Sequence, residues 1–290
     1  MSSPERLTVR CGDGVELTAW WHPVLGAPRG ALLLMPAIAT PGRTLRPLAE
    51  ALAREGWAVL RADYRFSGES LPRASRRHDA GMADLVLHDV PALLDELERR
   101  APGVPLACGG HSLGGQLSAL ALARHPERVR AAVLVTVSYP YEALWSFPHK
   151  ATVGLAFRLM PALATVFGRL PERPVGLGAE IPRTLIQDWG RWGRTGRYHS
   201  RGTDLAEVLR NVRGPVLSVC ATDDVLYAPE PAVAHYLAMM PHAQVERWMI
   251  SPSEMGVRQL GHFGLVKPHA AERLVARLGP WLQRVLGRTR

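Results

Sequence analysis

Short apolar runs alternate along this chain with segments whose apolar residues recur at helical spacing. Segments such as 45–55 and 82–99 place Leu and Val residues three or four positions apart, which predicts amphipathic helices. Two runs separated by Gly12-Asp13-Gly14 predict an opening hairpin. The apolar runs, each expected to form a strand, are 7–10, 15–21, 30–35, 58–62, 106–111, 130–136, 216–221 and 245–250. This order predicts an α/β fold, with a mostly parallel eight-stranded sheet and helices on both faces.

The alternation stops between residues 138 and 203. We therefore predict a core formed by residues 1–137 and 204–290 and a helical lid formed by 138–203, at the carboxyl end of the sheet where ligands bind in such folds. Its longest apolar stretch is interrupted by Arg158 and Pro161, which favours one lid helix or two over a transmembrane span. Nine aromatic residues fall in the insertion: Tyr139, Tyr141, Trp145, Phe147, Phe157, Phe167, Trp189, Trp192 and Tyr198.

The candidate nucleophile is Ser112, within Gly110-His111-Ser112-Leu113-Gly114. An apolar strand precedes this motif and an Ala/Leu-rich helix follows it. A serine on such a turn needs small neighbours two residues away on each side, so that strand and helix can cross closely. The turn also places the hydroxyl at the positive end of a helix. Because Gly-x-Ser-x-Gly also arises by chance in glycine-rich chains, the flanking strand and helix carry the prediction.

A nucleophilic serine requires a base, and the base requires an orienting group. Among eleven histidines, His262 stands out because glycines flank it in a loop between the last predicted strand and the final helix. Asp223 and Asp224 follow the preceding strand, and either carboxylate could orient the imidazole. We prefer Asp224 and keep Asp223 as the alternative, whose other role would be to cap the turn.

The order Ser112, Asp223 or Asp224, His262 is that of the α/β hydrolases. The chain resembles this fold family and, more narrowly, the bacterial predicted α/β hydrolases related to the serine aminopeptidase S33-like hydrolases. The likeness covers nearly the whole chain. The segments that carry it are Met35-Pro36-Ala37, Asp63-Tyr64-Arg65-Phe66-Ser67-Gly68-Glu69-Ser70, the turn at 110–115, Asp188-Trp189-Gly190-Arg191-Trp192 and Gly261-His262-Phe263-Gly264.

The resemblance implies acyl transfer to Ser112, with the backbone N–H groups of Leu113 and Ile38 holding the oxyanion. Pro36-Ala37 replaces the usual His-Gly after the first buried strand, and Phe66 stands where such proteins commonly have glycine. His111 is expected to pack at the turn. The residues expected to contact substrate are Ala37, Phe66, His111, Tyr139, Trp145, Trp189 and Trp192.

Composition and charge bear on the partners, cofactors and location of the protein. The net charge of +9 comes from scattered arginines, without a basic run interleaved with aromatics, so we expect no nucleic-acid partner. The N-terminal segment lacks an apolar signal sequence, and the three cysteines have no metal or redox spacing, which favours the cytoplasm. We expect neither a metal nor a nucleotide cofactor and no stable membrane insertion. Homo-oligomerisation is left open.

The sequence therefore predicts a serine hydrolase that cleaves a carboxylic ester or thioester with an apolar acyl or alcohol part. An acyltransferase or a lactone-forming enzyme would use the same triad. An aminopeptidase is disfavoured because the lid has no acidic cluster for a free α-amine. A non-catalytic binding protein is disfavoured by the intact set of serine, aspartate and histidine.

Overall fold

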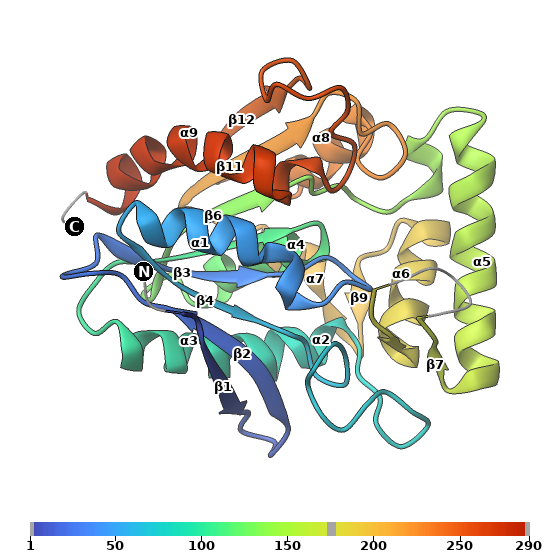
Figure 1. The fold of residues 1–290 in the computed structure, drawn as a ribbon. Coiled ribbons are helices and arrows are strands. Elements are labelled where there is room, and N and C mark those ends of the chain that lie inside the picture. Colours follow the sequence, from blue (N-terminus) through green and yellow to red (C-terminus); the bar gives the residue numbers. More distant parts are fainter. Residues whose placement is uncertain (1–2, 173–177, 288–290) are drawn as a thin grey trace.

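The computed structural model describes residues 3–172 and 178–287, which include an eight-stranded sheet (Figure 1). The strand order is β1-β2-β4-β3-β5-β6-β11-β12. β1 pairs antiparallel with β2, and β2 with β4, while all other neighbours are parallel. The predicted fold class is confirmed. The strands are β1 (Glu5–Arg10), β2 (Glu16–His22), β3 (Gly30–Met35), β4 (Trp57–Ala62), β5 (Leu106–His111), β6 (Val129–Val135), β11 (Pro215–Ala221) and β12 (Gln244–Ile250).

Helices cover both faces of the sheet because alternate strand residues point to opposite sides. In β3, Leu32 and Leu34 pack with α1 and α9, whereas Leu33 and Met35 belong to the core that contains α3 and α4. α2 and α3 are joined by a π-helical segment, Leu85–Asp89, so the helix predicted over 82–99 is one stretch with a local change of pitch. The helices of the core are α1 (Arg46–Arg54), α2 (Met82–Asp84), α3 (Val90–Arg100), α4 (Leu113–Arg124), α7 (Leu205–Leu209), α8 (Glu230–Ala238) and α9 (Pro268–Leu286).

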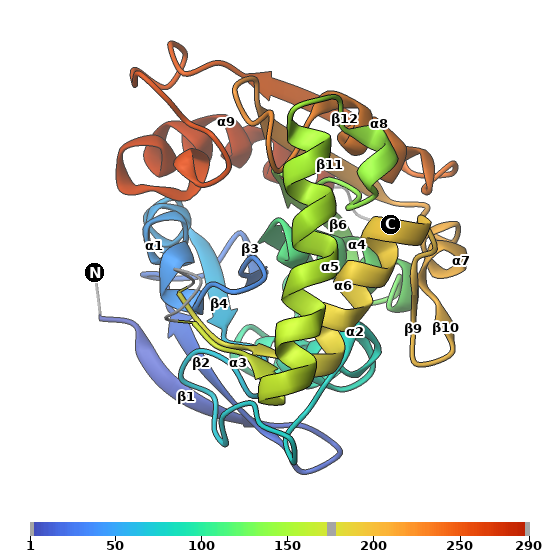
Figure 2. The same ribbon diagram turned by 90° about the vertical axis from the view of Figure 1, so that its right-hand side faces the viewer.

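Between β6 and α7 the chain forms the region expected to be a lid. Figures 1 and 2 show α5 and α6 side by side at one end of the sheet, with α5 outermost. The limits 138–203 for this lid stay a prediction. The elements here are α5 (His149–Phe167), α6 (Arg183–Thr195), β7 (Arg169–Leu170) paired with β8 (Ile181–Pro182), and β9 (His199–Ser200) paired with β10 (Thr203–Asp204).

α5 is one helix that continues through Pro161. A proline has no N–H, so the carbonyl of Phe157, four residues earlier, loses its helical donor. Arg194 of α6 supplies a replacement, because its Nη1 donates to that carbonyl at 2.6 Å. Gly190 and Gly193 permit the close approach, since a Cβ at Gly190 would overlap Pro161 and one at Gly193 would overlap the Phe157 ring. Packing against α6 thus explains why the proline does not break the helix.

Candidate active site

Ser112 lies on a tight turn between β5 and α4. Its backbone angles, φ 52° and ψ −114°, fall in a region that residues other than glycine rarely occupy. Two glycines make the turn sterically feasible: a Cβ at Gly110 would overlap the backbone of Gly114, and one at Gly114 would overlap the Met35 carbonyl. The structure therefore holds Ser112 at the N-terminus of α4, where the helix dipole favours negative charge.

Asp224 and His262 form a buried pair. His262 Nδ1 lies 2.6 Å from Asp224 Oδ2, and the two side chains are 6% and 2% exposed. A carboxylate in this position accepts the Nδ1–H and leaves Nε2 free to act as a base. The rings of Tyr227 and His262 pack with centroids 4.9 Å apart. Of the two candidate acids, Asp224 is therefore the one that contacts the imidazole.

Asp223 has a different task. Its Oδ2 accepts the backbone N–H of Leu260 at 2.9 Å, and its Oδ1 accepts that of Gly261 at 3.0 Å. Gly261 has φ 54°, a conformation that suits glycine. The carboxylate of Asp223 thus fixes the backbone of the loop immediately before His262.

His111 also stabilises the loop that carries His262. Its Nε2–H donates to the His262 carbonyl at 2.8 Å, and the Thr136 hydroxyl donates to that oxygen at 3.2 Å. Burial and, to a smaller extent, the neighbouring His262 together lower the pKa of His111 to about 3. The ring of His111 therefore stays neutral beside the imidazole that would become charged.

Ser112 and His262 both line one cavity of about 400 Å³. Among the described residues, no hydrogen bond joins Ser112 Oγ to the imidazole of His262. Such bonds are often long without substrate and shorten when substrate binds. Leu113 and Ile38 line the cavity too. Leu113 is the first residue of α4, so its N–H has no carbonyl one turn earlier and is available to an oxyanion.

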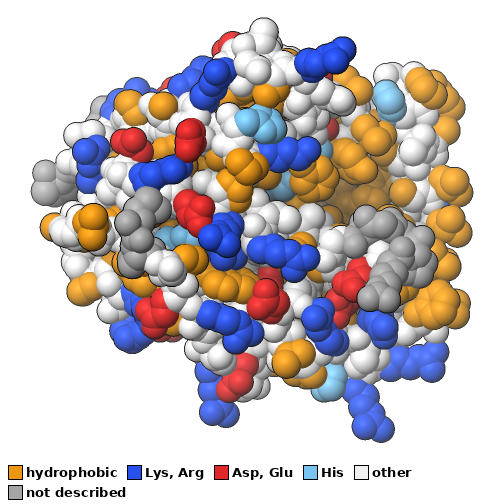
Figure 3. Space-filling model, in the orientation of Figure 1, with side chains coloured by type: hydrophobic (Ala, Val, Ile, Leu, Met, Phe, Trp, Pro, Cys, Tyr) orange, Lys and Arg blue, Asp and Glu red, His pale blue; other side chains and the backbone are white. Residues whose placement is uncertain are grey.

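The cavity wall is mainly apolar and is formed by the core together with α5 and α6. Figure 3 shows hydrophobic side chains around a hollow beside α5. Its volume suits a small-molecule ligand. No Asp or Glu is found among its described lining residues. The apolar side chains in the wall are Ala37, Ile38, Ala39, Leu113, Pro140, Trp145, Val153, Ala156, Phe157, Met160, Ile181, Ile186, Trp189, Leu226, Tyr227 and Phe263.

The residues expected to contact substrate divide into two groups. Ala37, Trp145 and Trp189 line the cavity. The other four do not, and the structure explains each position. Phe66 has φ 62° and packs with Ala74 and Ala80, and Tyr139 is buried against Tyr198 and His235. Trp192 is buried and donates its Nε1–H to the His199 carbonyl. His111 packs against the ring of His262 on the side away from the cavity.

Sequence reasoning missed Gln116, which lines the cavity one helical turn after Ser112. Its amide donates to the Ser138 carbonyl at 2.8 Å and accepts from the Tyr198 hydroxyl at 3.0 Å. The spacing of four residues places Gln116 on the same face of α4 as the serine, and this signal was available in the sequence.

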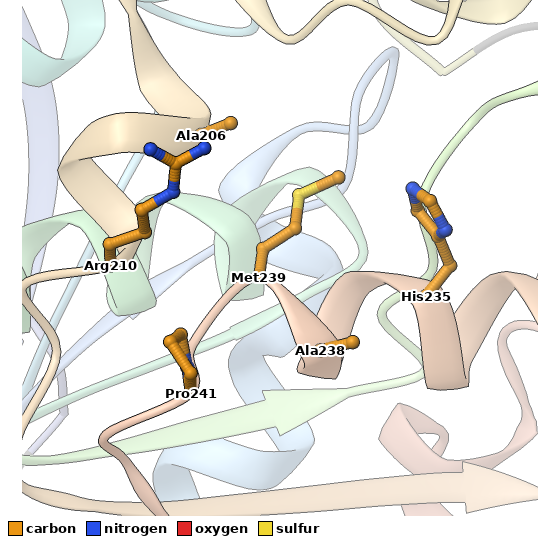
Figure 4. A pocket seen from close by; sticks show the side chains of 6 residues that line it. All are labelled: Ala206, Arg210, His235, Ala238, Met239 and Pro241. Carbon is orange, nitrogen blue, oxygen red and sulfur yellow. The ribbon is translucent and has the colours of Figure 1, made fainter.

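Among residues 3–172 and 178–287, no group of three or more His, Cys, Asp or Glu side chains could hold a metal ion. A separate cavity of about 260 Å³ lies beside α7 and α8 (Figure 4). Its lining shares no residue with the cavity of Ser112, and it consists of Ala206, Arg210, His235, Ala238, Met239 and Pro241.

Solved structures with the same fold are numerous. A soluble variant of monoglyceride lipase from Saccharomyces cerevisiae has TM-score 0.72 and 18% identity, covering 99% of this chain and 97% of that chain. The Pyrococcus furiosus esterase PF2001 has TM-score 0.66 and 18% identity, covering 98% and 92%. Est1E from Butyrivibrio proteoclasticus, with ferulic acid bound, has TM-score 0.65 and 15% identity, covering 97% and 100%. No curated protein matches the sequence significantly.

The sequence itself matches a family model. The model for the serine aminopeptidases of the S33 type aligns with residues 26–248, more than half of the chain. The aligned segment includes the turn of Ser112 and the Asp223-Asp224 pair, and the eight-stranded sheet has the order expected of the fold. The chain therefore belongs to the serine aminopeptidase S33 family of α/β hydrolases.

Proposed function

We propose that the protein is a serine hydrolase that cleaves a carboxylic ester or thioester with a substantial apolar part. The observation that carries the proposal is that His262, whose Nδ1 lies 2.6 Å from Asp224 Oδ2, lines the same cavity as Ser112. Nucleophile, base and orienting acid are thus assembled from three loops at the same end of the sheet.

In the proposed reaction the Ser112 hydroxyl attacks the substrate carbonyl while His262 Nε2 accepts its proton. Asp224 orients the imidazole and stabilises its positive charge. The N–H groups of Leu113 and Ile38 stabilise the tetrahedral oxyanion. His262 then protonates the leaving alcohol or thiol, and a water molecule activated by the same imidazole releases the acid.

The cavity favours an ester over a peptide substrate. Its wall is apolar, and it has no described carboxylate that could pair with a free α-ammonium group. This argues against aminopeptidase activity despite the description of the family.

The proposal is tested with a series of p-nitrophenyl esters from acetate to dodecanoate. Wild type should hydrolyse the medium and long members and be labelled by a fluorophosphonate probe, whereas Ser112→Ala should lose both properties. Product analysis with added alcohols separates hydrolysis from acyl transfer. A wild-type protein inert to every ester and to the probe would refute the proposal.

We also propose a cytoplasmic location. Cys11, Cys108 and Cys220 are free and buried. Burial raises the pKa of Cys11 and of Cys108 to about 12 and that of Cys220 to about 11, so all three remain thiols. Free thiols of this kind suit a reducing compartment. Fractionation of cells that express the protein tests the location, and recovery in the secreted fraction would overturn it.

A further inference from the structure

The outer face of α5 is an exposed apolar surface. Its residues recur three or four positions apart along the helix, so they form one continuous strip. Leu155 and Val166 are each 62% exposed and Leu159 is 51% exposed. We call this strip the outer stripe; its residues are Ala151, Leu155, Leu159, Ala162 and Val166.

The opposite face of α5 is apolar as well. Val153, Ala156, Phe157 and Met160 line the cavity of the candidate active site. A helix that is apolar on two opposite faces is normally covered on both, yet α5 lies at the edge of the molecule in Figure 1 and faces the viewer in Figure 2. It is also the one helix in the described ranges that is long and apolar enough to cross a membrane. Because its inner face belongs to the cavity wall, we argue for a surface contact rather than a span.

Basic side chains border the outer stripe. An open groove between α5 and α6 is lined by Arg158, Arg191 and Arg194. Arg158 pairs with Glu142 and Arg191 with Asp188. Arg194 donates to a backbone carbonyl and, among the described residues, has no ion-pair partner within 4.0 Å. Lys150 is exposed at the first turn of α5. Arg76 donates to the Val166 carbonyl at the last turn.

We propose that the outer stripe and its basic border dock the protein on the surface of an anionic phospholipid bilayer. Apolar side chains flanked by Arg and Lys match the boundary between acyl chains and negative headgroups. A second copy is a poorer occupant, because a two-fold contact would bring each arginine groove toward its equivalent. The protein's net charge of +9 adds attraction to a negative surface.

The experiment is co-sedimentation of the full-length protein with vesicles. Vesicles of phosphatidylcholine with one-third phosphatidylglycerol are compared with pure phosphatidylcholine, each at low and high salt. We expect binding to the anionic vesicles that weakens with added salt, because screening reduces the contribution of Lys150 and the arginines. Lys150→Glu should also weaken binding to the anionic vesicles, because it replaces a positive charge at the first turn of α5 with a negative one.

The apolar contribution is tested with Leu155→Glu/Leu159→Glu, neither of which lines the cavity. We expect a fall of roughly tenfold or more in the vesicle partition coefficient, since two leucines no longer enter the interface. The matched control is Leu25→Glu, another leucine that is 87% exposed and lies in the loop before β3. It should bind like wild type. Leu155→Ser/Leu159→Ser, which adds no charge, should give an intermediate loss.

Equal binding by wild type and both double variants would overturn the proposal, as would an absence of binding to anionic vesicles. Light scattering provides the other decisive outcome: a wild-type dimer that Leu155→Glu/Leu159→Glu dissociates would identify the stripe as a contact between copies. Circular dichroism and thermal unfolding of each variant serve as folding controls. Because vesicle binding needs no catalysis, this proposal and the proposed function can fail separately.

Discussion

Two adjacent aspartates, Asp223 and Asp224, allow a sharp test of the site. Asp224 contacts the imidazole of His262, whereas Asp223 accepts two backbone N–H groups of the loop that carries it. Asp224→Asn should therefore damage the chemistry, and Asp223→Ala should mainly damage stability. The two substitutions lie side by side, so each serves as the control for the other.

The magnitudes follow from these contacts. An amide at position 224 no longer favours the tautomer with a free Nε2 or stabilises the imidazolium, which costs on the order of 10³- to 10⁴-fold in kcat. Asp223→Ala removes two hydrogen bonds to a charged acceptor, at 2.9 and 3.0 Å. A hydrogen bond to a charged group contributes about 1.5–3 kcal/mol. Because Asp223 is partly exposed, we take the lower value for each of the two bonds, and the free energy of unfolding should fall by about 3 kcal/mol. The corresponding decrease in Tm is roughly 5–10 °C.

The assay combines steady-state kinetics on a p-nitrophenyl ester with thermal unfolding followed by circular dichroism. Asp224→Asn is expected to keep KM and most of its Tm while kcat collapses. Asp223→Ala is expected to melt earlier and to retain measurable kcat at low temperature. Asp223→Asn, which keeps one acceptor oxygen, should lie between wild type and the alanine variant in Tm.

The reverse pattern would refute the assignment. If Asp223→Ala abolished kcat at full stability while Asp224→Asn remained active, Asp223 would be the triad acid in solution. The loop would then have to rearrange relative to the structure described above.

Three further changes test other parts of the argument. Because the pKa of His111 is about 3 when folded and near 6.5 when unfolded, stability should be complete above about pH 6.5 and decline as the pH falls toward 3. In urea unfolding, the free energy of unfolding of wild type should fall between pH 6.5 and pH 5 by about 2 kcal/mol more than that of His111→Gln. Equal decreases in the two proteins would contradict a buried, neutral His111 ring. Ala156→Trp should fill the cavity and reduce kcat/KM for long-chain esters about tenfold while sparing acetate, and an unchanged chain-length profile would show that acyl chains bind elsewhere. Gly114→Ala should give insoluble or inactive protein, because its Cβ would overlap the Met35 carbonyl; a stable, active variant in expression and turnover assays would disprove the tight crossing.

The elements that sequence reasoning located were those with strong local signals. Buried strands such as β3 are continuous apolar runs, and the turn at Ser112 requires glycines at fixed positions. His262 could be selected because its loop follows the last strand. The sequence supported only a preference for Asp224 over Asp223, because a shift of one residue in a loop decides which carboxylate contacts the imidazole.

The region between β6 and α7, which we expect to be a lid, was harder to predict for a physical reason. In an apolar helix such as α5, periodicity does not distinguish the face toward the cavity from the face toward solvent. Phe157 and Met160 line the cavity, whereas Trp192 of α6 is buried away from it. The continuity of α5 through Pro161 depends on Arg194, a residue from another helix. The placement of these side chains and the continuity of α5 both depend on contacts between different elements, which no local sequence pattern contains.

The two faces of α5 connect the proposed chemistry with the proposed docking. Residues that line the cavity and residues of the outer stripe interleave along the same helix, as Leu155 and Ala156 illustrate. A bilayer that covers the outer face would therefore lie one helix diameter, about 10 Å, from the candidate substrate. An ester with an apolar tail partitions into such a bilayer, so docking would raise the local concentration of substrate without altering the triad. It follows that loss of docking should lower turnover of vesicle-borne esters and leave turnover of soluble esters unchanged.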